Sequence, residues 1–268
     1  YSVVEFDYKF CSMRSTEKHE EVEGECNCET SSFGKLFAVF LAKATSVFWM
    51  SKNQREKYFS RFPVLMSKSN YVLSSIFNEE LLDKLEELRT TSGVKKNSYL
   101  IMGSPSWIKG TEDAIEYATK HSLDYEIVQG LPYEDMLKKI SQHKGLIFLP
   151  KGADTCPRLV IEAALLGADV ILNDNVQHKD EHWFKDLDTS VISNYLRGRS
   201  DYFWDILHQN TKAHRVPKPT GSKSPVKYLF IVPVFNSELW IHKTIKSIKD
   251  QNKKAWRCFI GDDISDDT

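Results

Sequence analysis

Long hydrophobic runs are absent from this sequence of 268 residues. No apolar stretch approaches the roughly 20 residues that a membrane-spanning helix needs, so we expect no transmembrane helix. The chain begins with Tyr1, and its first residues show neither a signal peptide nor a natural start. An excess of basic charge is missing too, because 36 Lys and Arg accompany 37 Asp and Glu, for a net charge of −1. This balance gives no electrostatic basis for nucleic-acid binding.

Cysteine is scarce, and three of the five cysteines lie close together near the start of the chain. This distribution does not resemble a secreted disulfide framework, and we expect a cytoplasmic location. Cys11, His19, Cys26 and Cys28 follow the spacing C-x7-H-x6-C-x-C, which matches no standard zinc finger. Zinc binds four such ligands in closed structural sites, so the cluster is a candidate structural zinc site. The alternative is a loop with a solvent-exposed His19 and reduced cysteines.

The rest of the composition is that of a globular protein with a sizeable core, since 41% of the residues are hydrophobic. The length favours two domains. A polar segment with several prolines over residues 211–226 is typical of a linker. We predict a partial N-terminal region over 1–70, an α/β domain over 71–210, and the truncated start of a further domain over 227–268.

Short apolar runs alternate with segments of helical periodicity through the middle of the chain. The predicted strands cover residues 42–51, 71–75, 99–103, 124–128, 145–150 and 169–173. The predicted helices cover residues 54–59, 111–121, 133–143, 157–167 and, as a closing helix, 195–207. Repeated β-α-β-α order predicts an α/β fold with a doubly wound, Rossmann-like parallel sheet.

Two carboxylates follow the apolar strand at 145–150. Asp154 lies in the loop after the strand, and Glu162 lies eight positions further along, inside the next helix. In an open α/β sheet, ligands bind at the carboxyl ends of the strands, and a loop that leads into a helix offers free N–H groups to a phosphate. The inner carboxylate can accept hydrogen bonds from ribose or sugar hydroxyls. The structural alternative is that Asp154 caps a helix and Glu162 is a solvated surface residue.

This segment resembles the nucleotide-sugar subdomain of retaining GT-B glycosyltransferases of the family-four type. In that family a strand ending in Pro leads to a glutamate, seven residues, a second glutamate, then Ala and Gly. Glu162, Ala163 and Gly167 fall on this pattern, and Asp154 stands where the family has its first glutamate. The resemblance implies that Asp154 is a catalytic residue that orients the donor sugar, and that Glu162 holds the nucleotide ribose.

A second matching element follows the strand at 99–103. Lys109 and Gly110 match the Lys-Gly with which the family binds the donor diphosphate, whereas Ser104 and Ser106 occupy the loop that carries an Arg in the family. The resemblance implies that Lys109 acts in catalysis by neutralising the leaving diphosphate. Arg158 is a candidate additional phosphate ligand, with a surface salt bridge as the alternative. GT-B enzymes work without a metal, so we expect no cofactor for this part.

The C-terminal segment from 227 to 268 contains a strand ending in Pro-Val-Phe-Asn, an amphipathic stretch over 238–251, and a strand ending in paired aspartates. It resembles the opening βαβ unit of an inverting family-two, GT-A-type glycosyltransferase. The resemblance implies nucleotide binding by residues in these two motifs, namely Pro233, Asn236, Asp262 and Asp263. A complete GT-A domain would need Mg or Mn, at a site that we expect beyond Thr268. The alternative is a common α/β strand-helix-strand whose aspartates merely end a strand.

We therefore predict a fragment of a tandem glycosyltransferase that moves a sugar from a nucleotide-diphosphate-sugar donor to a glycan or lipid-linked acceptor. For the full-length protein we also expect peripheral contact with a membrane. Two alternatives stay open: a non-catalytic nucleotide-sugar-binding module, and a sugar-nucleotide epimerase of GT-B fold. His178 and His182 are predicted to lie at the surface, and the alternative is that they belong to the loop with which the family often contacts donor or acceptor. Nothing in the sequence activates Cys156 as a nucleophile.

Overall fold

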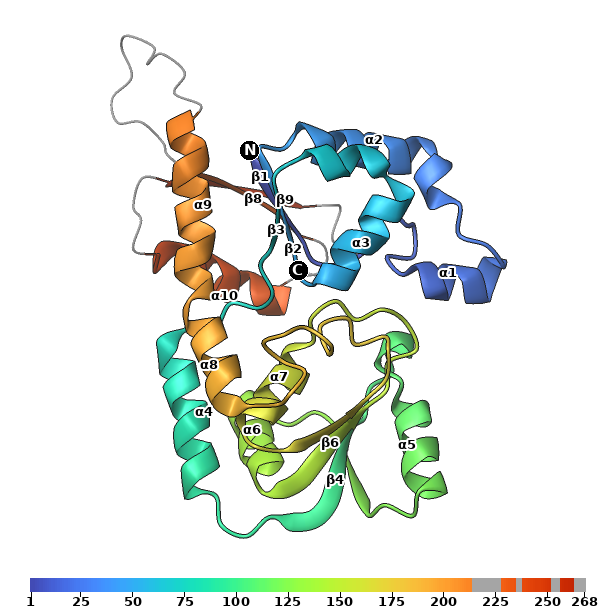
Figure 1. Ribbon diagram of the computed structural model, residues 1–268, viewed down its shortest axis with the longest axis vertical. Coiled ribbons are helices and arrows are strands. Elements are labelled where there is room, and N and C mark those ends of the chain that lie inside the picture. Colours follow the sequence, from blue (N-terminus) through green and yellow to red (C-terminus); the bar gives the residue numbers. More distant parts are fainter. Residues whose placement is uncertain (214–227, 235–237, 252–255, 263–268) are drawn as a thin grey trace. The chain divides into compact units, whose positions relative to one another are not determined.

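The protein is described by a computed structural model that covers most of the chain. The described residues are 1–213, 228–234, 238–251 and 256–262. They form an α/β structure with parallel sheets, in two compact units, Tyr1–His214 and Arg215–Thr268 (Figure 1). Among these residues, no helix is both long and apolar enough to cross a membrane.

The larger unit begins with a three-stranded parallel sheet in the order β1-β2-β3. Its strands are β1 (Ser2–Glu5), β2 (Ser46–Trp49) and β3 (Asn70–Val72). The elements between them are α1 (Thr16–Glu23), η1 (Cys28–Thr30), α2 (Ser32–Lys43), α3 (Lys52–Arg61) and η2 (Pro63–Ser67). Each of the three α-helices begins after a serine whose side chain accepts a hydrogen bond from the first turn, the capping pattern that favours helix initiation.

A second, four-stranded parallel sheet follows, in the order β5-β4-β6-β7. Its strands are β4 (Lys96–Met102), β5 (Tyr125–Val128), β6 (His143–Phe148) and β7 (Asp169–Leu172). The associated helices are α4 (Glu79–Thr91), η3 (Trp107–Lys109), α5 (Thr111–Lys120), α6 (Tyr133–Ser141) and α7 (Arg158–Leu165). The alternation predicted for this region is confirmed, and the helix α4 before it adds an element that the sequence analysis did not predict.

Helices cover both faces of the second sheet, and the side chains of its strands alternate between two cores. Leu100 and Leu146 belong to the larger core, which includes residues of α4, α6 and α7. Tyr99, Ile101 and Ile147 point to the other face and pack with α5. Figure 1 shows α5 on one side of β4 and β6, and α6 and α7 on the other. The apolar strands are therefore buried on both faces, as their sequences indicate.

The strand order creates a switch point between β4 and β6. From β4 the chain adds β5 on one side, and then crosses to add β6 and β7 on the other. The connections that leave the carboxyl ends of β4 and β6 therefore lead to helices on opposite faces of the sheet, α5 and α7, and in open parallel sheets this is where ligands bind. The fold thus directs attention to the loops that follow these two strands.

The unit ends in two helices, where the sequence predicted one over 195–207. Helix α8 (Thr189–Arg197) ends just before Gly198, and α9 (Arg199–Ala213) begins just after it. The helix α9 also includes the start of the segment that was predicted as a linker. Ile206 of α9 is buried with Phe48 of β2. This apolar contact with the first sheet stabilises α9.

The smaller unit contains β8 (Tyr228–Val234), α10 (Glu238–Lys249) and β9 (Trp256–Asp262). The two strands pair in parallel along their whole length, from Tyr228 opposite Trp256 to Val234 opposite Asp262. The predicted strand-helix-strand unit is confirmed in these described residues.

Candidate functional site

An ion pair connects the two loops at the switch point of the second sheet. Lys109 lies at the end of η3, in the loop after β4, and Asp154 lies in the loop after β6. The Lys109 Nζ donates a hydrogen bond to Asp154 Oδ2 at 2.8 Å. The lysine side chain is 39% exposed and the aspartate 14%, so the pair is open to solvent mainly on the lysine side. Both residues were selected from the sequence, and the structure brings them into contact.

Gly110 makes this contact feasible by allowing the two loops to approach each other closely. Its backbone is left-handed, with φ of 60°, and a Cβ at this position would stand 1.8 Å from the carbonyl oxygen of Leu149. The Lys151 amide also donates to the Ile108 carbonyl at 3.2 Å. Only a glycine satisfies both the conformation and the close approach.

The backbone of Asp154 is fixed by an isolated parallel β-bridge to Val176. The Asp154 amide donates to the Asn175 carbonyl at 2.8 Å, and the Gln177 amide donates to the Asp154 carbonyl at 3.1 Å. Helix α7 is preceded by Pro157 as its capping residue. Asp154 is therefore not a helix cap, and that alternative is wrong.

Glu162 lies inside α7 and is only 3% exposed, so the alternative of a solvated surface residue is wrong. The Tyr133 hydroxyl donates to Glu162 Oε1 at 2.6 Å, and Arg158 Nε lies 3.4 Å from the same oxygen. Burial raises the pKa of the Glu162 carboxyl, while the Tyr133 hydrogen bond opposes the change. Tyr133 was not selected from the sequence, although its place at the start of α6, just after β5, was a usable signal.

Arg158 is anchored on the α7 side of the sheet. Its Nη1 donates to the Ile76 carbonyl at 3.1 Å, and its guanidinium lies 4.1 Å from the centre of the Phe77 ring. Within the described residues, no hydrogen bond or ion pair joins Arg158 or Glu162 to Lys109 or Asp154. The predicted residues therefore form two separate polar groups along one edge of the sheet.

Two of three further residues from the sequence analysis, Cys156 and His178, are buried, and the third, His182, is exposed. Cys156 is buried, and burial raises the pKa of its thiol to about 12, which disfavours the reactive thiolate at neutral pH. His178 is fully buried, and the prediction that it lies at the surface is wrong. Its ring stacks on Trp183 at 5.5 Å and packs against Phe184 at 4.5 Å, two aromatic residues a little further along the same segment. His182 is exposed, as predicted.

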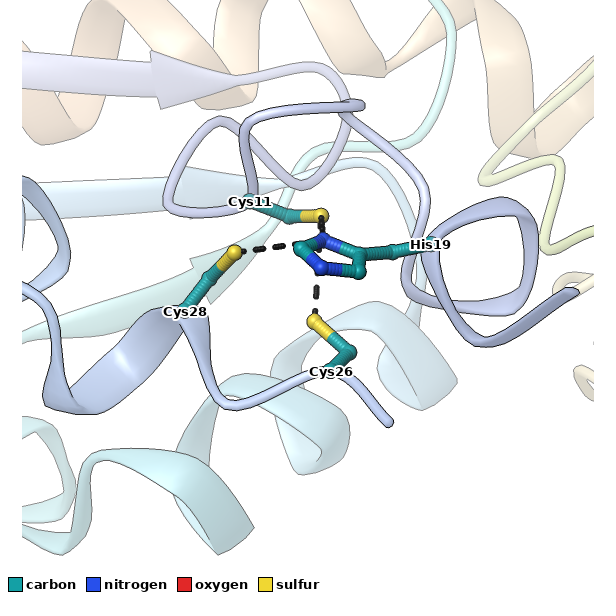
Figure 2. Close-up of side chains that lie close together, drawn as sticks. All are labelled: Cys11, His19, Cys26 and Cys28. Carbon is teal, nitrogen blue, oxygen red and sulfur yellow. Dashed lines mark hydrogen bonds between the residues drawn. The ribbon is translucent and has the colours of Figure 1, made fainter. Parts of the chain in front are cut away.

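The four residues of the predicted metal cluster also come together, in the loops around α1 (Figure 2). The ligand atoms of Cys11, His19, Cys26 and Cys28 all lie within 4.8 Å of one another. His19 is 7% exposed, so the alternative of a loop with a solvent-exposed His19 is wrong. Burial raises the pKa of the Cys11 thiol to about 12, and a bound cation would reverse this preference by binding the thiolate.

In the smaller unit, two of the four predicted nucleotide-binding residues fall on described strands. Pro233 pairs with Gly261 near the end of β8, and Asp262 ends β9 beside Val234. Asn236 and Asp263 lie outside the described residues. The paired strand ends place Pro233 and Asp262 at the same edge of this sheet.

The fold and site together define an α/β protein whose polar side chains gather at the carboxyl edge of a parallel sheet. Residues 229–268 match the model of a known family, described as glycosyl transferase family 2; this match covers less than half of the chain. No curated protein matches the sequence. Among solved structures, the chain is similar to AviGT4, a glycosyltransferase involved in avilamycin A biosynthesis, with 12% identity and a TM-score of 0.37. The similarity covers 63% of this chain and 65% of that chain.

Proposed function

We propose that the larger unit is the donor-binding domain of a GT-B-type glycosyltransferase, and that it holds the diphosphate of a nucleotide sugar at the loops after β4 and β6. The observation that carries this proposal is the Lys109–Asp154 pair, which bridges these loops at the switch point of the sheet. A cation beside a carboxylate at this edge is suited to a ligand that combines phosphate charge with sugar hydroxyls.

The start of α5 supports the placement of the diphosphate. Gly110 provides no side chain to cap this helix, so the N–H groups of its first turn are free of a side-chain cap and face the loop of Lys109. Glu112 and Asp113 in the first turn would repel an anion, but Lys151 Nζ lies 3.6 Å from a carboxylate oxygen of each and offsets their charge. The partly exposed ammonium group of Lys109 would then neutralise the phosphate.

Glu162 would hold a hydroxyl-bearing part of the donor. Tyr133 and Arg158 both contact its Oε1, and no hydrogen bond within the described part of the chain is made to Oε2. The second oxygen can therefore accept a hydrogen bond from a ribose hydroxyl once the ligand displaces the surrounding side chains. Asp154 would exchange its hydrogen bond from Lys109 for one from the donor sugar.

The complete reaction that we propose is transfer of the sugar to a glycan or lipid-linked acceptor. The family-two match of residues 229–268 supports a second glycosyltransferase domain, of GT-A type, joined to the first. In that domain Pro233 and Asp262, with Asn236 and Asp263, would contact the nucleotide. The GT-B part would act without a metal, and the complete GT-A domain would use Mg or Mn.

A second candidate function is a binding module without turnover. It is favoured by the ion pair itself, because Asp154 is mostly enclosed and neutralised by Lys109, and so lacks a free carboxylate directed at a donor. Product analysis of the full-length protein separates the two functions, since the module would bind the donor and release no transferred sugar.

Calorimetric titration of the chain with UDP, GDP and ADP tests the donor site. We expect saturable binding of one nucleotide, weakened about 10- to 100-fold in Lys109→Ala, because a charge-assisted hydrogen bond contributes about 1.5–3 kcal/mol and each 1.4 kcal/mol is tenfold. Glu162→Gln is expected to lower the affinity for the same nucleotide, because it changes the group that would bind the ribose.

The matched control is Lys84→Ala, which removes a lysine of similar exposure from an ion pair with Glu134 between α4 and α6. We expect this variant to bind the nucleotide as the parent chain does. Absence of binding to all three nucleotides, or an affinity that Lys109→Ala leaves unchanged, would contradict the proposed site.

A further inference from the structure

The Cys/His cluster is composed entirely of side chains that bind soft or borderline metal ions. Cys11 precedes α1, His19 lies on it, Cys26 follows it, and Cys28 begins η1. Four ligands of this kind, converging from one helix and both of its flanking loops, are the composition of a closed structural site. The mechanism proposed above uses none of them.

Three of the six separations between ligand atoms agree with those of a zinc tetrahedron, and the ligand atoms all lie within 4.8 Å of one another. Zn–S bonds of about 2.3 Å and a Zn–N bond of about 2.0 Å require S···S edges of about 3.8 Å and S···N edges of about 3.5 Å. The Sγ atoms of Cys11 and Cys26 are 3.8 Å apart. The Nδ1 atom of His19 lies 3.4 Å from Cys11 Sγ and 3.3 Å from Cys28 Sγ (Figure 2). The side chains are thus already arranged around a point that a metal ion would fill.

The second nitrogen of the His19 ring is held by a carboxylate. Its Nε2 lies 2.9 Å from Glu23 Oε2, one turn further along α1. Metal-bound histidines almost always donate their other ring N–H to such a partner, which fixes the tautomer and leaves the ligating nitrogen unprotonated. With Nε2 donating to Glu23, it is Nδ1 that faces the three sulfurs. The contact between His19 and Glu23 is an observation independent of the cysteine spacing, and it also indicates a metal ion bound at His19 Nδ1.

Helix α1 is joined to α3 by the ion pairs Glu17–Lys57 and Glu20–Arg61, but it buries few side chains. It has eight residues, of which Thr16 and His19 are buried, and its sequence is otherwise highly charged. A helix this short is marginal by itself, and most helices depend on an apolar face that packs on the core. The buried side of α1 instead presents an imidazole to three thiols.

We propose that Cys11, His19, Cys26 and Cys28 bind one zinc ion in a closed structural site that fixes α1 to its flanking loops. Four protein ligands leave no position for a substrate, so the ion has no part in catalysis. The loops around α1 and the Asp154 loop are neighbours. Ser15, the capping residue of α1, lies so close to Gly152 that a Cβ added there would stand 2.9 Å from its Oγ.

Metal analysis of the full chain, purified under reducing conditions without added metal, is the first test. We expect one zinc per chain, and we expect Cys26→Ser to lose it. Cys258→Ser is the matched control, because Cys258 is a free thiol of the other unit, and it should keep the zinc. A parent chain without zinc, a chain that carries iron instead, or a Cys26→Ser variant with full zinc content would overturn the proposal.

Cobalt substitution keeps the test decisive if Cys26→Ser does not fold. Co²⁺ exchanged into the parent chain should give the intense ligand-field bands of a tetrahedral site, together with thiolate-to-metal charge transfer. His19→Cys retains four ligands and is expected to bind cobalt with stronger charge transfer. An octahedral cobalt spectrum in the parent chain, or a His19→Cys variant unable to bind cobalt, would overturn the assignment.

Glu23→Ala tests the partner of His19 without removing a ligand. Loss of such a partner typically lowers metal affinity about 10- to 100-fold, and we expect a decrease of this size in competition with a chelator. Glu21→Ala, an exposed glutamate on the same helix, is the control and should bind zinc as the parent does. Equal affinities of the two variants would contradict a ligating His19 Nδ1.

Discussion

Replacement of Gly110 by alanine is expected to lower the free energy of unfolding of the larger unit by about 2–5 kcal/mol. A left-handed backbone costs a non-glycine residue about 1–2 kcal/mol, and an added methyl in a closely packed place costs about 1–3 kcal/mol. Both apply here, because φ is 60° and the Cβ would stand 1.8 Å from the backbone oxygen of Leu149. The atom in the way belongs to the main chain, so the two loops must separate.

Urea denaturation of Gly110→Ala measures this loss through its midpoint. Gly93→Ala is the matched control, since a Cβ at Gly93 meets nothing within 4 Å and its backbone is not left-handed. The control should be neutral or slightly stabilising, because alanine reduces the entropy of the unfolded chain. If Gly110→Ala were as stable as the control, the close contact between the loops after β4 and β6 would be wrong. If the loops separate, the 2.8 Å contact between Lys109 and Asp154 should also be lost.

Much of the second sheet was predictable because its central strands, β4 and β6, are largely buried. Continuous apolar runs such as 145–150 are typical of parallel strands, and the helices between them show clear periodicity. The amphipathic helix α4 was overlooked, and two other elements that were not predicted are weakly patterned. Strand β1 has four residues, and the polar helix α1 has no apolar stripe to reveal it. Elements held by tertiary contacts rather than by their own pattern leave little signal in a single sequence.

The candidate site was predictable where a residue follows a strand. Asp154 was selected in this way and Lys109 from the family's Lys-Gly motif, and the structure adds that they pair with each other. The hydrogen bond from Tyr133 to Glu162 joins α6 to α7. It could not be predicted, because the two residues are far apart in the sequence. His178 was predicted at the surface because Lys and Asp residues lie near it in the sequence, whereas Trp183 and Phe184, five and six residues further along, enclose its ring. The way in which this segment folds onto itself, rather than its composition, decides the environment of His178.

The buried His178 is expected to make the stability of the protein depend on pH. Burial lowers its pKa from 6.5 to about 3, and within the described residues neither ring nitrogen has a hydrogen-bond partner. Between these values the unfolded chain binds a proton that the folded chain does not. Stability therefore falls as pH decreases below 6.5, by up to about 1.4 kcal/mol per unit from this residue.

Glu5 acts in the opposite sense over part of the same range. It is fully buried, and burial raises its pKa from 4.5 to about 7, although Lys9 opposes the change. Between these values the folded chain binds the additional proton, so this residue makes stability fall as pH increases. From pH 4.5 to 6.5 the contributions of His178 and Glu5 oppose each other, and the parent chain should show only a shallow dependence from this pair.

The variant His178→Phe separates the two effects, since it keeps an aromatic ring against Trp183 and removes the titrating group. Unfolding measured from pH 7.5 to 5 should show the variant gaining about 2 kcal/mol relative to the parent at pH 5, whatever fixed packing cost the larger ring adds at all pH values. Glu5→Gln should change the profile in the opposite direction, and the double variant should return the dependence close to that of the parent. Parallel profiles for His178→Phe and the parent would mean that the imidazole is protonated equally in both states, and that its ring reaches solvent or a charged partner.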